Sequence, residues 1–477
     1  MTFRQILFSL RKSKLLLLLL TIFFVKQLFT VAVFPIFQGP DEPIHYSRVQ
    51  QSANPVFRSS ESNNKPSGSK FSEEINNTSA MTEAERISFD SFETQYFTNS
   101  QNGKSEDEIK NSNWNRLAEN PYTTGNKFIN YYSLNSSIEK MFSEQDIFSR
   151  FFAIRIFSAI LGLLSVLFIF LSARKIFDEK ISFLFSIIIA FQPMLSQTSA
   201  VVNYDVLLTL AFSIFAYGAV WALKEGPDWK NVSILILSTI LGIATKAPGI
   251  VLALAICCLA VYSVKKRFKI RNNLFAIGTI IAILLAIIIV IVVLPSSYIN
   301  SLLSVSENSH FNSVSQSILE YISETKNRWS WSELSYWGNF GWLDARIPSW
   351  IVDVAHYVEI AGILGIVAYF VFPKKIPEFL PRRKFVIFFI GIFLALEFAI
   401  RFADWPYYNR SGKIGLGTPG RYFLPVIGAQ FALVAIGIGM LARKYSIWKN
   451  ILKVLALSMI ILWTYSMLII IIPRYYL

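Results

Sequence analysis

The 477-residue sequence has few charged residues, two cysteines and three histidines, and each scarcity limits what the protein can be. Charged residues make up 16% of the chain, against roughly 25% in soluble domains, while apolar residues make up 53%. This composition excludes an ordinary soluble protein. Cys257 and Cys258 are neighbours inside an apolar run, where neither a relaxed disulfide nor a metal site is expected. The sequence also lacks a repeat of fixed period and a Gly-rich phosphate loop.

Long apolar segments are what the chain does have. Those at 15–37, 274–294 and 451–472 approach or exceed the ~20 apolar residues that span a bilayer. The first lacks a small-residue cleavage site, so we interpret it as a retained helix and not as a signal peptide. The sequence predicts an all-α polytopic membrane protein with eleven transmembrane helices, at about 15–37, 148–173, 181–200, 204–223, 231–246, 249–264, 274–295, 350–372, 384–402, 421–442 and 450–472.

The distribution of charge predicts how these helices are oriented. Residues 38–146 carry 16 acidic and 10 basic residues, whereas the rest of the chain carries 35 basic and 15 acidic residues. The basic residues cluster in alternate short linkers, which is the positive-inside pattern and not a nucleic-acid-binding face. We therefore expect a lipid bilayer and no nucleic acid as partner, with the N-terminus inside and the C-terminus outside. If 231–246 and 249–264 were one long broken helix, everything after them would invert.

The predicted helices divide the chain into five parts: the N-terminus with the first helix (1–37), a large outside loop (38–147), helices two to seven (148–295), a Trp-rich outside loop (296–349) and helices eight to eleven (350–477). In the first loop, the polar tract at about 59–82 is typical of disorder, whereas mixed charges at 82–117 allow a helix. The Trp-rich loop and the residue after it hold five of the eleven tryptophans. Trp337 and Trp342 are compatible with a membrane interface and with a platform for sugar rings, and both interpretations stay open.

The residues best suited to chemistry follow the first helix, in the segment Pro40-Asp41-Glu42-Pro43-Ile44-His45-Tyr46. A carboxylate just outside the bilayer can take a proton from a sugar or polyprenol hydroxyl and so act as a general base. A neighbouring carboxylate can raise the pKa of that base or help to hold a divalent metal. The two prolines restrict the backbone around the acidic pair. The alternative is a solvated helix-exit turn with incidental charge.

Further polar residues lie near the predicted outer ends of other helices. These residues are Asn203, Asp205, Lys246, Arg401, Asp404 and Arg421, and Arg155 lies a turn or two inside the second helix. Ionisable residues beside apolar spans are candidates for function, although those at helix ends can also extend into water. An acid can serve as the base of a transfer reaction, and lysine and arginine opposite it can bind an anionic phosphate leaving group.

Three motifs, in their order along the chain, resemble the bacterial membrane family called domain of unknown function 2142. They are Pro40-Asp41-Glu42-Pro43-Ile44-His45, Ser335-Tyr336-Trp337-Gly338-Asn339-Phe340-Gly341-Trp342-Leu343-Asp344 and Gly420-Arg421-Tyr422-Phe423-Leu424-Pro425, with Asn203-Tyr204-Asp205 and Lys246-Ala247-Pro248-Gly249 as weaker markers. That family resembles the glycosyltransferase class C fold, whose members carry an acidic catalytic residue in the first outside loop and use polyprenyl-phosphate sugars as donors. Tyr131-Tyr132 followed by Arg155-Ile156-Phe157-Ser158 also resembles this fold, without its usual Pro-Pro before the tyrosine.

The resemblance implies an inverting glycosyltransferase in the bacterial cytoplasmic membrane. It would move a sugar from a polyprenyl-phosphate donor to a cell-surface glycan or lipid-linked acceptor on the outer face. Asp41 would be the base, Glu42 and His45 would orient it, and Asp41 and Glu42 would bind Mg²⁺ or Mn²⁺. The predicted substrate-binding residues are Arg421 and Lys246, which would hold the donor phosphate, with Asn203, Asp205, Arg155, Tyr422, Trp337 and Trp342. A transporter or a polymerase of lipid-linked glycans is the alternative, and a transporter should have charged residues deep within its helices.

Overall fold

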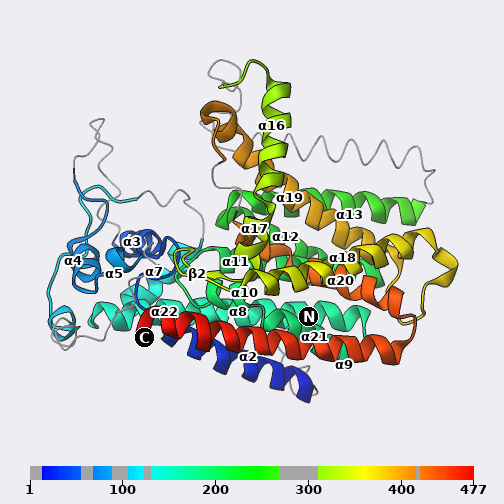
Figure 1. Cartoon of the computed structure of the whole chain (residues 1–477), viewed down its shortest axis with the longest axis horizontal. Helices are drawn as coiled ribbons and strands as arrows, with labels where there is room; N and C mark the ends of the chain where they lie inside the picture. The colour runs from blue at the N-terminus through cyan, green and yellow to red at the C-terminus, as the bar shows by residue number, and fades with distance from the viewer. Residues whose placement is uncertain (1–12, 55–67, 89–105, 123–129, 269–309, 415–418) are drawn as a thin grey trace.

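The computed structural model describes residues 13–54, 68–88, 106–122, 130–268, 310–414 and 419–477 (Figure 1). In these ranges the chain is almost entirely helical, with one pair of two-residue antiparallel strands, β1 (Asn339–Phe340) and β2 (Ala345–Arg346). Eight described helical segments are long and apolar enough to cross a membrane. The prediction of an all-α polytopic membrane protein is therefore confirmed.

The helices of the bundle are α2 (Lys14–Val33), α8 (Ile147–Ile176), α9 (Glu179–Ala190), α10 (Pro193–Thr198), α11 (Asp205–Glu225), α12 (Trp229–Thr245), α13 (Ile250–Phe268), α18 (Ser349–Val371), α19 (Arg383–Ser411), α20 (Ile427–Ala442), α21 (Tyr445–Tyr465) and α22 (Ile472–Tyr476). The loops contribute α3 (Glu42–Ala53), α4 (Glu73–Met81), α5 (Ala84–Ile87), α7 (Tyr131–Met141), α16 (Val314–Asn327) and α17 (Trp329–Trp337). Short 3₁₀ turns are η2 (Ala247–Gly249), η4 (Pro373–Lys375) and η5 (Gly420–Val426), and η6 (Ser466–Ile471) is a π-helical link.

The predicted helices have counterparts among these elements, except for 274–295, which lies outside the described residues. The prediction of one continuous helix at 181–200 is wrong, because the chain breaks between α9 and α10. Pro193 has no backbone N–H and suits the first position of a new helix. Gln192 caps that helix, since its side-chain oxygen accepts a hydrogen bond from the N–H of Leu195.

The predicted turn at residues 246–249 is confirmed. Helix α12 ends at Thr245, η2 follows, and α13 begins at Ile250. A Cβ atom on Gly249 would lie 2.1 Å from the backbone carbonyl of Gly242, so only a glycine lets the two segments approach this closely. The chain therefore forms two helices here instead of one long broken helix.

The described part of the first loop predicted to lie outside gathers at one end of the bundle, where α3, α4, α5 and α7 form a small lobe, whereas α16 of the second such loop projects from the top of the view (Figure 1). Within the polar tract expected to be disordered, residues 73–81 form α4, whose Ile75 is buried in the main hydrophobic core. The C-terminal helix α22 lies at the same end. Its Arg474 donates to the carbonyl of Ile87 and pairs with Asp344 at 2.6 Å. The C-terminus is thus packed against the loops that are predicted to lie outside.

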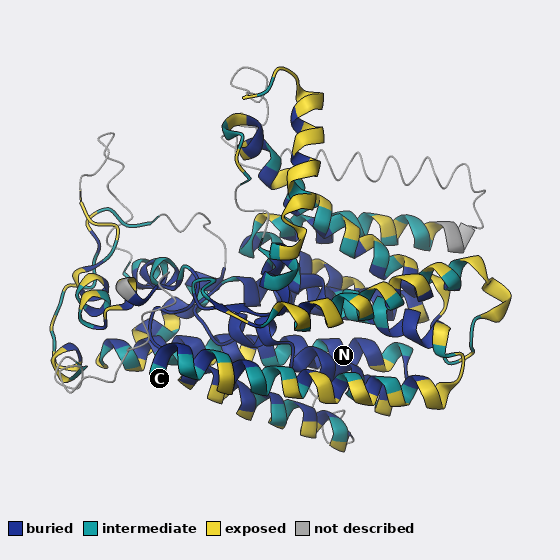
Figure 2. Cartoon of the chain, viewed as in Figure 1, coloured by how far each residue is buried: buried dark blue, intermediate teal, exposed yellow. Residues whose placement is uncertain are grey.

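Exposed residues, yellow in Figure 2, run along the outer helices of the bundle, and the apolar ones among them indicate which faces meet lipid. They lie along α2, α12, α18, α19 and α21, for example Leu17, Leu237, Leu364, Leu394 and Leu457, each more than half exposed. A protein in water would bury so many leucines. A bilayer solvates them, so these helix faces fit a membrane environment.

The orientation in the membrane can be tested by labelling single cysteines. With Cys257 and Cys258 replaced by serine, a Ser69→Cys variant lies in the lobe and a Ser446→Cys variant lies in a basic linker, both at exposed positions. Because basic linkers stay on the cytoplasmic side, we expect a membrane-impermeant maleimide added to intact cells to label Ser69→Cys and not Ser446→Cys. Labelling of Ser446→Cys alone would show that the protein has the opposite orientation in the membrane.

Candidate functional site

The acidic motif sits in a tight turn between α2 and α3. Gly39 has no room for a side chain, because a Cβ atom there would lie 2.8 Å from Val201. Asp41 adopts a left-handed backbone conformation with φ of 58°, which is uncommon outside glycine and recurs at functional sites. Its carboxylate is 49% exposed, while Glu42 next to it is fully buried. The turn therefore directs two neighbouring carboxylates into different environments.

Glu42 and Arg155 form a buried ion pair. Arg155 donates from Nε and Nη2 to the two carboxylate oxygens, each at 2.7 Å, and the N–H groups of Gly39 and Val202 donate to the same oxygens at 2.8 Å. Arg155 also donates to the carbonyls of Phe34 and Pro35. Four donors occupy the carboxylate of Glu42, so the geometry does not support its predicted roles in metal binding or catalysis. The substrate-binding role predicted for Arg155 is not supported for the same reason, and the pair instead joins α3 to α8.

Arg421 lies beside Asp41, as predicted. Its Nη2 is 3.7 Å from Oδ2 of Asp41, a distance that allows attraction between the charges without a direct hydrogen bond. The guanidinium is 7% exposed, and its Nε and Nη1 have no hydrogen-bond partner among the described residues. Buried nitrogens of a charged group are costly to leave unpaired. This end of the bundle thus offers two strong donors next to a half-exposed carboxylate.

Lys246 approaches the same place from the turn between α12 and α13. Its Nζ is 2.9 Å from Oδ1 of Asp205 and lies 4.7 Å and 4.1 Å from the ring centroids of Tyr204 and Tyr422. Asn203 does not face this group; its side chain accepts a hydrogen bond from the N–H of Asp205 and so fixes the start of α11. The predicted residues Lys246, Asp205 and Tyr422 therefore come together, while Asn203 supports them.

His45 lies one turn along α3, within a group of tyrosines. Its Nδ1 is 2.9 Å from the hydroxyl of Tyr132, which also accepts a hydrogen bond from Arg48 at 3.0 Å, and its ring meets the edge of Tyr204. Burial lowers the pKa of His45 to about 3, an effect opposed by Asp205 and reinforced by Arg48, Lys246 and Arg421. His45 is therefore neutral at pH 7 and suited to hold the tyrosine in place.

This burial predicts a pH dependence of stability. The unfolded chain takes up a proton at His45 near pH 6.5, whereas the folded chain resists protonation until about pH 3. Burial of neutral His45 therefore costs the folded protein no stability above pH 6.5. Below that pH the free energy of unfolding decreases as the pH falls towards 3, by at most about 1.4 kcal/mol per pH unit. We expect His45→Gln, which cannot titrate, to lose less thermal stability than the wild type between about pH 7 and pH 5. Equal losses would contradict the inferred burial of a neutral histidine.

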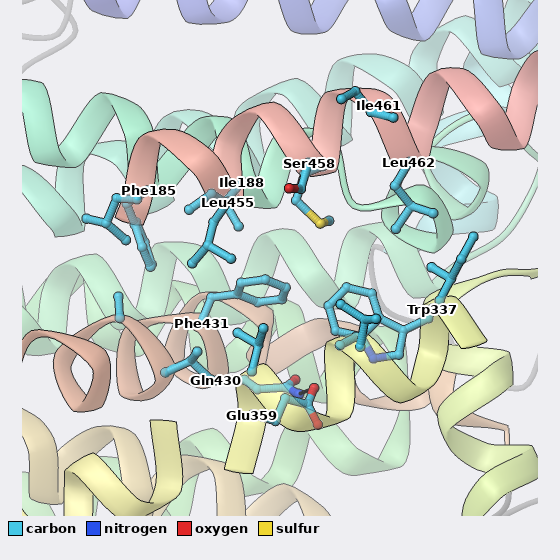
Figure 3. Close-up of a pocket in the computed structure, with 18 of the residues that line it drawn as sticks. Phe185, Ile188, Trp337, Glu359, Gln430, Phe431, Leu455, Ser458, Ile461 and Leu462 are labelled. Atoms are coloured by element: carbon cyan, nitrogen blue, oxygen red, sulfur yellow. Dashed lines mark hydrogen bonds between the residues drawn. The ribbon is translucent and has the colours of Figure 1, made fainter. Parts of the chain in front are cut away.

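Trp337 and Trp342, both predicted to bind substrate, lie at different places in the structure. The indole N–H of Trp342 donates to the carbonyl of Phe37 at 3.0 Å, which ties the Trp-rich loop to the turn before Asp41. Trp337 is 6% exposed and lines a cavity of about 440 Å³ between α18, α20 and α21 (Figure 3). The two rings therefore lie in different surroundings, and the binding of a sugar ring by either one stays a prediction.

Two groups were not predicted from the sequence. Arg48 and Tyr132 join the site only through the packing of α3 on α7. Glu333, His356 and Glu359 offer ligand atoms that all lie within 4.8 Å of one another. The spacing of His356 and Glu359, three residues apart in a predicted helix, was the signal available for the second group.

Comparisons with known proteins give one match. The model of a family described as a predicted membrane protein, DUF2142, covers residues 23–428. No curated protein and no solved structure matches the chain. The matched range contains the acidic turn, Lys246 and Arg421 together.

Proposed function

The chain belongs to the DUF2142 family of predicted membrane proteins, and from that premise we propose that it is an inverting glycosyltransferase of the class C type. It transfers a sugar from a polyprenyl-phosphate donor to a glycan or lipid-linked acceptor at the outer face of the bacterial cytoplasmic membrane. The observation that carries the proposal is the juxtaposition of Asp41 and Arg421. A half-exposed carboxylate lies 3.7 Å from a buried guanidinium that has two nitrogens without partners.

The reaction assigns one role to each group. The Asp41 carboxylate takes the proton of the acceptor hydroxyl, whose oxygen attacks the anomeric carbon of the donor sugar. The bond from that carbon to the phosphate oxygen breaks, and polyprenyl phosphate leaves with the electron pair. Attack from the face opposite the phosphate inverts the anomeric centre. Asp41 ends the step protonated and returns its proton to solvent, to which it is exposed.

Arg421 is suited to the departing phosphate. Its open nitrogens can donate paired hydrogen bonds to phosphate oxygens, and a guanidinium keeps its charge at any physiological pH. Lys246 adds a second positive charge, but Asp205 already pairs with it, so we give it the smaller role. The ring of Tyr422 lies beside both cations and limits the access of water. Donors placed where charge develops are the main source of rate enhancement in such sites.

We expect Arg421→Lys to lower the transfer rate about tenfold and Arg421→Ala about a hundredfold. Lysine keeps the charge but loses the planar pair of donors. The measurement is the initial rate with purified protein in liposomes. Arg401→Lys is the matched control, because Arg401 lies within the neighbouring helix α19 and is paired with Glu397. Equal effects of the two lysine variants on the rate would show that Arg421 does not bind the donor phosphate.

The proposal as a whole is tested by donor turnover. Purified protein in liposomes is supplied with a panel of polyprenyl-phosphate sugars and with lipid-linked or soluble glycan acceptors. We expect release of polyprenyl phosphate in equal amount to the glycosylated acceptor, with one donor sugar preferred. A folded protein that releases polyprenyl phosphate from none of the panel would contradict the proposal.

A transporter of lipid-linked glycans is the second candidate, and Lys26 is the observation in its favour. This residue lies well inside α2 and is 5% exposed. Its ammonium group donates to the carbonyl of Ala190, at the end of α9, and to the hydroxyl of Ser196, each at 2.6 Å. The first bond gives the carbonyl of Ala190 a partner at the break between α9 and α10, and both bonds hold the two helices together. The burial of Lys26 therefore has a structural explanation. The group around Asp41 has none, which favours the enzyme.

A further inference from the structure

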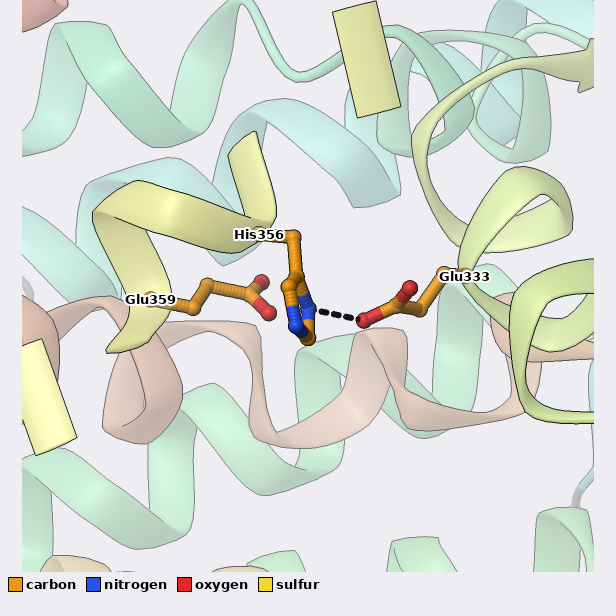
Figure 4. Close-up of side chains that lie close together, drawn as sticks. All are labelled: Glu333, His356 and Glu359. Carbon is orange, nitrogen blue, oxygen red and sulfur yellow. Dashed lines mark hydrogen bonds and ion pairs between the residues drawn. The ribbon is translucent and has the colours of Figure 1, made fainter. Parts of the chain in front are cut away.

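A second cluster of ionisable residues lies away from Asp41, where α17 meets α18 (Figure 4). Glu333 comes from α17, and His356 and Glu359 come from one face of α18. Nδ1 of His356 is 2.7 Å from Oε1 of Glu333, and the three side chains offer ligand atoms within 4.8 Å of one another. Ligand atoms around a tetrahedral Zn²⁺ lie about 3.4 Å apart, given bonds of about 2.0–2.2 Å. Small rotations of the side chains bring all three to that separation.

The surroundings of the cluster contain polar atoms that lack partners. Glu333, Glu359, Tyr336 and Gln430 line a small cavity of about 60 Å³. The hydroxyl of Tyr336, a residue that is 5% exposed, and Oε1 of Gln430 have no hydrogen-bond partner among the described residues. A bound water or ion can satisfy buried oxygens of this kind. These oxygens therefore offer acceptors for a bound group beside the charged residues.

The charge of the cluster is also incomplete. Among the described residues, Glu333 pairs only with the imidazole of His356. Glu359 forms no ion pair there, although it accepts a hydrogen bond from the amide of Gln430 at 3.4 Å. Glu359 lies inside the span α18, at the polar end of the 440 Å³ apolar cavity (Figure 3). Carboxylates at such a depth are expensive unless a cation compensates them. Glu359 in the span and Glu333 on α17 lie on either side of the imidazole of His356 (Figure 4).

We propose that Glu333, His356 and Glu359 bind a divalent transition-metal ion of the zinc type. Two carboxylate oxygens and one imidazole nitrogen are a ligand set that such ions accept, with a fourth position left for water. That position faces the small cavity, where the hydroxyl of Tyr336 and the amide oxygen of Gln430 can accept hydrogen bonds from the water. The site thereby explains the charges and the unpaired oxygens together.

The ion would position the neighbouring part of the chain. It joins α17 to α18, and α17 in turn holds the start of η5. The hydroxyl of Ser335 accepts a hydrogen bond from the N–H of Gly420, and a Cβ atom on Gly420 would lie 2.1 Å from the carbonyl oxygen of Ser332. Arg421 follows directly. The cluster is thus a positioning site for η5, and its existence does not depend on the reaction assigned to Asp41.

The test is metal binding to the full-length protein, carrying an affinity tag without histidine and purified in nanodiscs. After removal of bound metal, we expect the wild type to take up about one Zn²⁺ per chain by elemental analysis and to unfold at a higher temperature with Zn²⁺ than without it. Glu359→Gln should bind Zn²⁺ at least about tenfold more weakly. Asp353→Asn, an exposed acid on the same helix, should bind like the wild type.

Three outcomes would overturn the site. One is a wild type that takes up no more Zn²⁺ than Glu359→Gln. Another is equal affinity for Mg²⁺ and Zn²⁺, because an imidazole ligand favours zinc. If Glu359→Gln does not fold, Co²⁺ added to the wild type gives the answer, since four-coordinate cobalt in a protein site absorbs visible light much more strongly than hydrated cobalt does. A spectrum of hydrated cobalt alone excludes the site. These readouts need no transfer activity, so failure of the proposed function leaves them intact.

Discussion

Replacement of Asp41 by asparagine is expected to leave a folded protein that has lost about 10²–10⁴-fold of its transfer rate. Asparagine has nearly the same shape and tolerates the left-handed backbone at this position, where φ is 58°. It cannot accept the proton of the acceptor hydroxyl. Since the carboxylate is 49% exposed and its ion pair with Arg421 is loose, removal of the charge should cost little stability. The measurements are the rate in liposomes and the unfolding temperature of the same preparation.

The matched control for Asp41 is another half-exposed acid in the lobe, away from Arg421. Glu119→Gln suits this purpose, since that residue is exposed next to Gly68. We expect it to retain the full transfer rate. An Asp41→Asn protein with nearly normal turnover would show that another group accepts the proton.

The adjacent carboxylate should behave in the opposite way. Glu42→Gln leaves the guanidinium of Arg155 buried without its counter-charge, and we expect a loss of about 3–5 kcal/mol in the free energy of unfolding. Both side chains have no exposed area, so solvent cannot replace the lost partner. The measurement is unfolding in detergent or nanodiscs, by heat or by denaturant. Activity should fall only as far as the folded fraction does.

A double variant separates the pair from its surroundings. Glu42→Gln together with Arg155→Met removes both charges, and it should be less destabilised than the sum of the two single variants, because neither charge is left alone. Purely additive effects would mean that the two side chains do not interact in the folded protein. A Glu42→Gln protein with normal stability and no activity would instead show that Glu42 takes part in the reaction.

Asp41 and Glu42 illustrate what a local pattern cannot decide. The sequence presents them side by side, with Asp41 as the candidate base, Glu42 as a catalytic residue that orients it, and both as candidate metal ligands. Their environments diverge because the tight turn at Gly39 points one outward and the other toward α8, where Arg155 is 113 residues away along the chain. Only contacts of such long separation distinguish the exposed carboxylate from the buried one.

Local patterns in the sequence predict the class of the protein, most of the described helices and the turn at 246–249, but not the break between α9 and α10. A transmembrane helix satisfies its own backbone hydrogen bonds. A span can therefore be predicted from the length of its apolar segment alone, as at 15–37 and 450–472. The turn at Pro248 and Gly249 is likewise a property of those residues. Only the folded structure shows how closely Asp41 and Arg421 approach, that Glu42 is held by Arg155, and that Glu333 faces His356 and Glu359. These pairings depend on which helices pack together, and a one-dimensional pattern of polarity does not contain that information.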